Sequence, residues 1–162
     1  MPKRVYTRSY ASVRFTAPDL DPLDVTVRLR LPPDHTHHAG EPRLRRARRT
    51  GRVVENATFS HGMWMMSSRE WVDSPRLATH IEWLLAELEP KADDVRALFA
   101  SGVEGDIFCY SIGPTPRLPP LPRRLRERVF ALGLRIDIDH YDSRPFDDDP
   151  SDEKPGFQVK DS

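Results

Sequence analysis

The 162-residue sequence has one cysteine, Cys109, so the chain cannot form an internal disulfide bridge. A single thiol in an apolar run fits a reducing compartment. No stretch approaches the ~20 apolar residues of a membrane span, and residues 1–15 lack the apolar core of a signal peptide. We therefore expect a cytoplasmic protein that has no membrane partner.

The sequence also lacks net charge, because Lys+Arg and Asp+Glu each total 25. Lysines are few, and acidic residues cluster near the C-terminus. A run of arginines without an acid stands at residues 43–52 and can attract phosphate or an acidic partner. Its members are Arg43, Arg45, Arg46, Arg48, Arg49 and Arg52.

A chain of this length is the size of one ordinary domain and can bury roughly two-thirds of its unfolded surface. We divide it into an extension at residues 1–8, one domain at 9–142 and a disordered acidic tail at 143–162. The tail is charged, contains proline and has almost no apolar residues, which is typical of disorder. Within the domain, residues 41–57 are expected to form a flexible arginine-rich loop.

Strands are predicted in four segments, at residues 10–17, 62–68, 106–112 and 134–141. The first and last alternate apolar and polar residues with period two. The segment at 106–112 is apolar on both faces, which indicates a central strand.

Helices are predicted where apolar residues recur at helical spacing, at residues 75–88, 90–102 and 121–132. Gly102 and Gly133 are suited to end the second and third of these helices.

Residues 20–31 allow two interpretations. Asp21 is suited to cap a helix and Pro22 to occupy its first position. The apolar residues from Val25 to Leu31 nevertheless alternate as in a strand. We favour the helix, because its start is better marked.

The resulting order is strand, helix, strand, helix, strand, helix, strand, with a long polar connection at residues 32–57. The expected fold is a single α+β domain with a four-stranded, mainly antiparallel sheet and about three helices on one face. A ferredoxin-like or related arrangement is the simplest form of such a fold.

Five segments occur in a distinctive order: YASVRFTA, GMWMMSS, HIEWLLAELEP, DIFCYSI and ALGLRIDIDHY. With the Pro-x-x-x-x-x-x-Gly-x-Pro loop that ends at Pro42, they resemble the bacterial "domain of unknown function 4279" family from about Tyr10 to Tyr141. MWMMS replaces the family's Trp-Ser-Leu, and His140 interrupts its closing Asp-x-Tyr. The resemblance implies a small α+β domain and favours the helix at residues 22–31. It implies no reaction and brings no catalytic residues.

Three histidines, His35, His37 and His38, crowd into the stretch PPDHTHHAG. In a strand, His35 and His37 would share one face and His38 would point to the other. Zinc needs three or four converging ligands, and no cysteine pair or His-Glu-x-x-His motif is present. We favour a solvated loop, or histidines that titrate near neutrality, and assign no metal or cofactor. His37 and His38 are kept as candidate binding residues.

Asp137 and Asp139 stand two apart and therefore share one face of the last predicted strand. Paired carboxylates could bind a cation or perform acid–base work, but a solvent-facing side with a salt bridge to Arg135 is the favoured interpretation. Trp64, in the middle of a predicted strand, is a candidate for ligand stacking, although a core role is favoured.

Gly40, Arg43, Arg45 and Arg46 complete the candidate binding set. No aromatic residues interleave with the arginines and no nucleic-acid motif surrounds them, so a solvated loop is the simpler interpretation. Cys109 lies in an apolar strand, where the pKa of a thiol rises, and is not expected to act as a nucleophile. The sequence contains no phosphate-cradling glycine loop, Gly-x-Ser-x-Gly motif or dinucleotide fingerprint.

Three functions follow, in order of preference. The first is a non-enzymatic module that binds another protein through an open sheet face or residues 32–57, of which an immunity-type protein that neutralises a toxin is one form. The second is a metal-dependent or otherwise uncharacterised enzyme that uses His35–His38 with Asp137 and Asp139. The third is a nucleic-acid-associated protein that uses Arg43–Arg52. The identity of the partner and the oligomeric state stay open.

Overall fold

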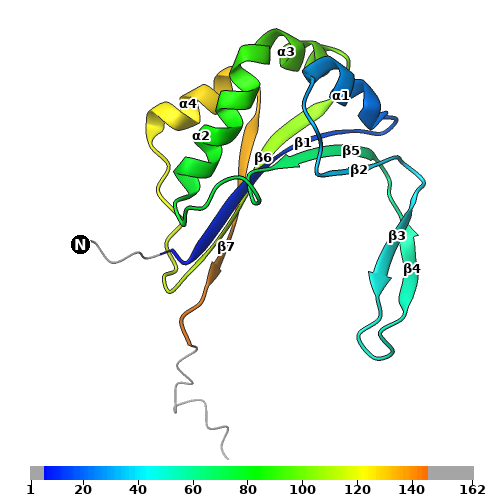
Figure 1. Ribbon diagram of the computed structural model, residues 1–162, viewed down its shortest axis with the longest axis horizontal. Helices are drawn as coiled ribbons and strands as arrows, with labels where there is room; N and C mark the ends of the chain where they lie inside the picture. Colours follow the sequence, from blue (N-terminus) through cyan, green and yellow to red (C-terminus); the bar gives the residue numbers. More distant parts are fainter. Residues whose placement is uncertain (1–5, 146–162) are drawn as a thin grey trace, which may run out of the picture.

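The computed structural model describes residues 6–145, which form a five-stranded main sheet in the order β2-β5-β1-β6-β7 (Figure 1). A separate two-stranded sheet pairs β3 with β4. The strands are β1 (Arg8–Ala17), β2 (His35–His37), β3 (Pro42–Arg46), β4 (Val53–Thr58), β5 (Gly62–Ser67), β6 (Glu104–Gly113) and β7 (Arg135–Asp142). The helices within the described range are α1 (Pro22–Leu29), α2 (Leu77–Leu88), the 3₁₀ helix η1 (Glu89–Lys91), α3 (Ala92–Ala100) and α4 (Arg123–Ala131).

The succession β1-α1-β2-β5-α2-β6 has the β-α-β-β-α-β order of a ferredoxin-like domain. β1 pairs antiparallel with β5 and with β6, and β2 pairs antiparallel with β5. β1 and β2 therefore run parallel, with β5 between them. The β3–β4 hairpin is inserted before β5, and the unit formed by α4 and β7 is appended at the end.

The α+β class is confirmed, and three of the four strand pairings are antiparallel, as a mainly antiparallel sheet requires, but the predicted count of four strands is wrong. β2 is a fifth strand, and its three residues are too few to show period-two alternation. β7 pairs parallel with β6, because α4 carries the chain back along the sheet before β7 begins. The sheet is therefore mixed. Its middle strand is β1 rather than β6.

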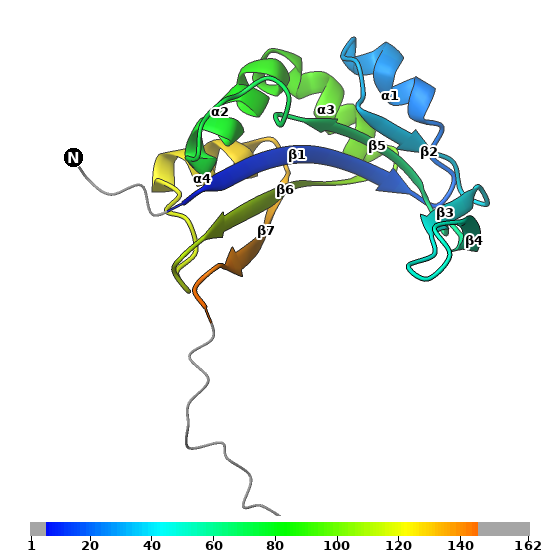
Figure 2. The same ribbon diagram turned by 60° about the horizontal axis from the view of Figure 1, so that its bottom comes forward.

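The helices lie on one face of the main sheet and leave the other face uncovered (Figure 2). On β1, Ala11, Val13 and Phe15 are fully buried, and they alternate with residues of the opposite face. The apolar stripe of α2, which includes Ile81 and Leu84, completes the core above the sheet. One face of the sheet is thus fully used for folding, and the other remains available for contacts.

The ambiguous segment at residues 22–31 is a helix, α1, as predicted. The side chain of Asp21 accepts a hydrogen bond from the backbone N–H of Leu23 at 3.1 Å, which satisfies a free donor of the first turn. The helix ends at Arg30, which adopts the left-handed conformation at φ 55°. The ammonium group of Lys91 donates to the backbone carbonyl of Leu29, so the helix end is also capped from a distant segment.

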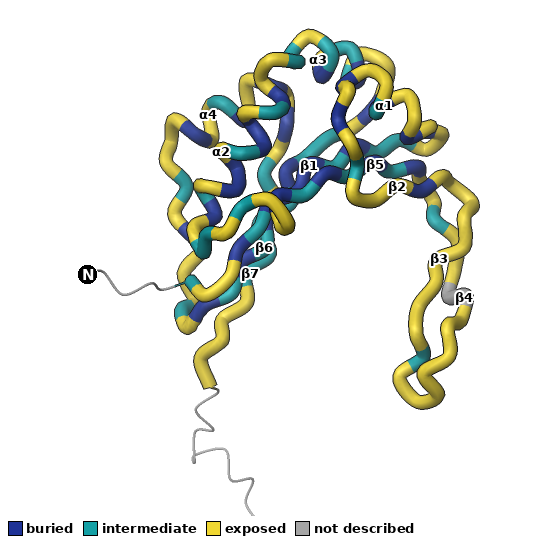
Figure 3. Tube along the Cα trace, viewed as in Figure 1, coloured by how far each residue is buried: buried dark blue, intermediate teal, exposed yellow. Residues whose placement is uncertain are grey.

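The polar connection predicted at residues 32–57, with its arginine-rich loop at 41–57, contains three strands that were not predicted, namely β2 and the two strands of the β3–β4 hairpin. The hairpin extends from the β2–β5 edge of the sheet, away from the helices, and is exposed along most of its length (Figure 3). Since neither of its faces packs on the core, its sequence shows no apolar alternation, and its strands are hidden from a pattern search.

Within the described residues, no helix is long and apolar enough to cross a membrane. Gly102 and Gly133 follow α3 and α4 with positive φ angles of 95° and 83°, as their predicted role as helix ends requires. The extension and the acidic tail lie largely outside the described residues.

Candidate functional site

The uncovered face of the main sheet carries an array of aromatic side chains. Residues that pair directly across strands place their side chains on the same face, so Tyr10 of β1 lies beside Tyr110 of β6. Their rings stack with centroids 4.9 Å apart, and the ring of Tyr141 on β7 lies 5.5 Å from that of Tyr110. Phe108 continues the row along β6. We define the aromatic row as Tyr10, Phe108, Tyr110 and Tyr141.

Charged side chains border this aromatic row. Arg14 makes a bidentate ion pair with Asp106, with N–O distances of 2.8 and 2.5 Å, and its guanidinium lies 4.7 Å from the ring centre of Phe108. The hydrogen bond to Asp106 raises the pKa of Arg14, so this positive charge is permanent. The guanidinium of Arg69 lies 5.6 Å from the ring centre of Tyr10.

Asp137 and Asp139 lie on this same face, as their spacing predicts. Asp137 is 64% exposed in its side chain and lies 3.8 Å from Arg14 rather than in a salt bridge to Arg135. Asp139 accepts a hydrogen bond from the hydroxyl of Tyr141 at 3.0 Å. The two carboxylates are therefore part of the polar border of the aromatic row.

His35 and His37 also face the uncovered side, since they pair with Met65 and Met63 of β5. The Nε2 atom of His35 lies 3.0 Å from Nδ1 of His37, and the ring of His37 stacks on Phe59 with centroids 3.5 Å apart. Burial and the neighbouring His35 lower the pKa of His37, so its ring stays neutral at pH 7.

His38 points away from this pair and contacts two acids, Glu41 at 2.8 Å and Asp21 at 3.4 Å. The hydrogen bond to Glu41 raises the pKa of His38. His38 thus joins the end of β2 to the start of α1, which is a local structural role.

The histidine pair and the aspartate pair share a face but not a site. β2 and β7 are the two edge strands of the main sheet, so the pairs are separated by four strand spacings, or about 19 Å. Among residues 6–145, no group of three or more His, Cys, Asp or Glu side chains converges as metal ligands would. The structure does not bring together the residues that the enzyme hypothesis combined.

The arginine run forms the exposed β3–β4 hairpin. Arg43, Arg45 and Arg46 lie in β3, and the guanidinium of Arg43 lies 5.4 Å from the ring centre of Phe59. Gly40 precedes the hairpin at φ 83°, where its N–H donates to the carbonyl of Phe59 at 2.8 Å. Gly40 therefore sets the direction of the hairpin through its backbone.

Trp64 and Cys109 lie in the core. Trp64 is fully buried, and its indole N–H donates to the hydroxyl of Thr26 at 3.0 Å. The favoured core role of Trp64 therefore describes its position, and its ring is not accessible for stacking. Burial raises the pKa of the Cys109 thiol to about 12, in agreement with the prediction that it is not a nucleophile.

Sequence reasoning missed a buried serine–histidine pair formed by Ser68 and His80. The Ser68 hydroxyl lies 2.7 Å from Nδ1 of His80, while Nε2 lies 2.7 Å from the carbonyl oxygen of Ser74. Because a carbonyl can only accept, Nε2 carries the proton and Nδ1 accepts from Ser68. Burial lowers the pKa of His80, which keeps this ring neutral.

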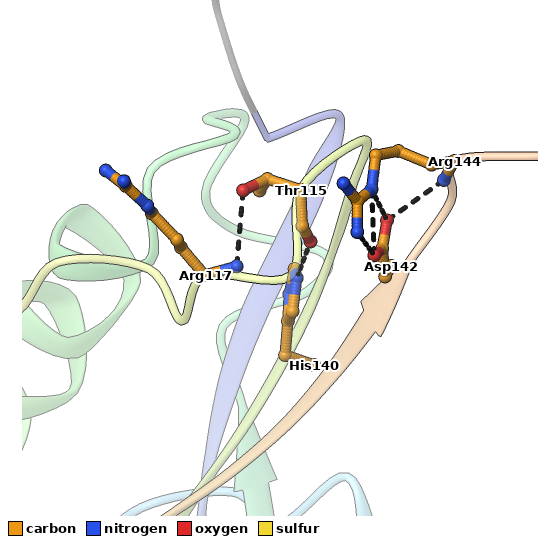
Figure 4. A network of polar contacts seen from close by, with 5 residues as sticks. All are labelled: Thr115, Arg117, His140, Asp142 and Arg144. Atoms are coloured by element: carbon orange, nitrogen blue, oxygen red, sulfur yellow. Dashed lines mark hydrogen bonds and ion pairs between the residues drawn. The ribbon is translucent and has the colours of Figure 1, made fainter.

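A second pair of the same design joins Ser111 and His140. The Ser111 hydroxyl lies 2.8 Å from Nδ1 of His140. Nε2 of His140 lies 2.7 Å from the carbonyl oxygen of Thr115 (Figure 4). Serine and histidine at this distance can form a nucleophile and base. Both serines are fully buried, however, and each histidine forms a hydrogen bond to a loop carbonyl through its second ring nitrogen. The pairs are therefore clips that hold loops 68–76 and 113–122 to the sheet.

A family model described as a domain of unknown function (DUF4279) matches residues 6–143. No curated protein and no solved structure matches the chain. The match covers all five strands of the main sheet and the helices above it.

Proposed function

We propose a function from the geometry alone, because this chain belongs to the DUF4279 family, whose description names no activity. The proposed function is that of a non-enzymatic module that binds another protein through the uncovered face of its main sheet. The observation that carries it is the aromatic row with its arginine border.

The composition of this face supports a protein partner. An antiparallel sheet that merely faces water carries polar residues on its outer side. The outer side here carries Tyr10, Phe108 and Tyr110, and the paired residues Met63 and Met65 on β5. Tyrosine, phenylalanine, methionine and arginine are the residue types enriched in protein interfaces, and lysine is depleted there.

The partner is expected to bury an aromatic ring at the centre of the interface and to leave the charged side chains that border the aromatic row at its rim. Tyr141 is 50% exposed and can be covered without rearrangement of the core. The ion pair of Arg14 with Asp106 holds a guanidinium beside Phe108, so polar groups for orientation lie next to apolar area. Rigid aromatic and arginine side chains are the residues that most often dominate binding energy.

The test is photocross-linking in cells that express the protein, with p-benzoylphenylalanine in place of Tyr141 or Phe108. The matched control places the same group at Phe130, which is 56% exposed on α4, on the helical side of the sheet. A protein adduct from the sheet positions but not from Phe130 is expected. Adducts that are identical at all three positions, or none at the sheet positions, would contradict the proposal.

An immunity-type protein is the more specific form of this proposal. In that case the cross-linked partner is a toxin, and the purified protein inhibits it. Tyr141→Ala should then weaken inhibition by roughly tenfold or more, as expected for an aromatic residue at the centre of an interface. Phe130→Ala should leave inhibition unchanged. An adduct with a protein that has no toxic activity would remove the immunity-type form alone.

A second candidate function, nucleic-acid binding, is favoured by the shape of the arginine run. The run forms a two-stranded ribbon that extends from the sheet, and a ribbon of this kind fits the major groove of DNA. Arg43, Arg45 and Arg46 make no ion pair with another described residue. They are therefore available for phosphate contacts.

Binding of a labelled 20-base-pair duplex and of single-stranded RNA, measured across salt concentrations, tests this candidate. If three arginines reach phosphates of the duplex, log K should fall with log salt with a slope of about −2.7. Arg43→Gln/Arg45→Gln/Arg46→Gln should abolish that slope, while the exposed pair Arg123→Gln/Arg124→Gln on α4 should not. A slope near zero for the wild-type protein would contradict the candidate.

A further inference from the structure

An apolar groove lies at the β2–β5 edge of the sheet, and Met66 lines it from the helical side. It has a volume of about 340 Å³, which is within the range of small-ligand sites. Leu31, Pro32 and Pro33, from the connection between α1 and β2, form one wall, and Met66 of β5 contributes from the sheet. These four side chains are apolar and carry no charge.

Two tryptophans form the other wall. Trp83 projects from α2 and packs partly against the core, and Trp71 comes from the loop after β5. Their indole rings are nearly parallel, with an interplanar angle of 10° and centroids 6.3 Å apart. Trp71 is nevertheless 67% exposed, which is a large area for the residue type with the greatest apolar surface. Such an exposed indole beside a groove is typical of a ligand contact.

The only charged residues that line the groove within the described chain are acidic. They are Asp34 and Glu87, and no arginine, lysine or histidine lies among the lining residues. One oxygen of Asp34 accepts a hydrogen bond from the N–H of Ser67 at 2.6 Å, which fixes its carboxylate in place. Glu87, half-buried on α2, makes no hydrogen bond or ion pair with another residue of the described chain. A negative charge is thus left without a partner beside two indole rings.

From this combination we propose that the groove binds a small organic cation with an alkylated ammonium group. The faces of indole rings attract cations within about 6 Å of the ring centre, and tryptophan is the strongest aromatic partner for them. Alkyl groups on the nitrogen suit the apolar proline and methionine walls, and Glu87 supplies the countercharge. The rings are too close to each other for the cation to lie between them, so it lies over an outer ring face of the pair.

This site is independent of the proposed protein-binding face. The groove residues come from α2, loop 68–76, the α1–β2 connection and Met66 of β5, whereas the aromatic row comes from β1, β6 and β7. Asp34 alone among the groove residues also lines a pocket that includes Tyr10 and Phe108. A protein partner on the sheet face would leave the groove open. The two proposals can therefore fail separately.

The test uses choline and its uncharged carbon isostere, 3,3-dimethylbutan-1-ol, as probes of the whole chain. The indole N–H signals of the three tryptophans are followed by NMR during titration. Choline should shift the signals of Trp71 and Trp83 saturably at millimolar concentration and leave that of buried Trp64 in place. The isostere should bind about tenfold more weakly, because it lacks the charge that the indoles and Glu87 attract.

Variants separate the charge from the apolar surface. Glu87→Gln should weaken choline binding by about tenfold and leave binding of the isostere unchanged. Glu70→Gln is the matched control, since Glu70 is exposed and lies outside the groove. Equal affinity for the two probes, or no saturable shift with choline, would overturn the proposal. Trp71→Ala should also abolish the choline response at Trp83. Because Trp71 is exposed, this variant should unfold at the same temperature as the wild-type protein, which a thermal scan checks.

Discussion

Removal of the Ser68 hydroxyl should reveal how much the buried serine–histidine clip contributes to stability. This hydroxyl has two buried partners: it accepts from the N–H of Ala11 at 3.0 Å and donates to Nδ1 of His80 at 2.7 Å. Ser68→Ala leaves one donor and one acceptor without a partner in the interior. At about 1–3 kcal/mol for each unsatisfied group, the free energy of unfolding should fall by roughly 2–6 kcal/mol.

Ser111→Ala is the matched comparison, because this serine is equally buried and also faces a histidine. Among residues 6–145 its hydroxyl has one partner, Nδ1 of His140, so one group rather than two loses its hydrogen bond. The expected loss is about 1–2 kcal/mol, since His140 is only half-buried and water can reach it. The difference between the variants therefore reflects the bond to the Ala11 N–H together with the deeper burial of His80.

Urea unfolding at pH 8, followed by circular dichroism and by tryptophan fluorescence, gives both free energies. The slope m should stay the same in the wild-type protein and both variants, since the surface exposed on unfolding does not change. A loss for Ser68→Ala that is no larger than that for Ser111→Ala would refute the assignment of two satisfied partners to Ser68.

Three further predictions concern the close contact of Gly62, the hydrogen bond between Thr26 and Trp64, and the protonation of His80. Gly62→Ala should lower the free energy of unfolding by at least about 2 kcal/mol in the same urea assay, because an added Cβ would lie 2.2 Å from the backbone oxygen of Leu20; a loss below about 0.5 kcal/mol would contradict this close approach. Thr26→Val should cost about 1–3 kcal/mol, since the buried indole N–H of Trp64 loses its acceptor, whereas Thr26→Ser should keep most of the stability; equal losses in a thermal scan would show that the hydroxyl is not the cause. Burial lowers the pKa of His80, so the unfolded chain binds this proton at a higher pH than the folded protein does. The stability that His80 contributes is therefore present above its ordinary pKa of about 6.5 and is lost as the pH falls through the lowered pKa of the folded protein. The urea concentration at the midpoint of unfolding should fall less between pH 8 and pH 5 in His80→Gln than in the wild-type protein. The same pH dependence in both proteins would refute the linkage.

Local interactions explain why much of the fold could be predicted from the sequence. The cap that Asp21 provides for α1 acts across two residues, and the helix stops at Gly102 and Gly133 act within one turn. The alternation along β1 records a strand with one buried face, whatever its neighbours are. The strands β1, β5, β6 and β7, the helices and the burial of Cys109 all follow from signals of this kind.

The tertiary structure decided what the candidate sites can do, because those sites depend on strand order and register. His35, His37, Asp137 and Asp139 share a face, yet the order of the strands places the two pairs at opposite edges. The spacing of residues in the sequence carries no information on that order, since β2 is too short to be seen and β7 joins the sheet in parallel. The sequence by itself determined the helices and the strands β1, β5, β6 and β7. Only the long-range strand pairing determined that aromatic rings from β1, β6 and β7 lie together on the uncovered face. Side chains on neighbouring strands come into contact only when the register of the two strands aligns them.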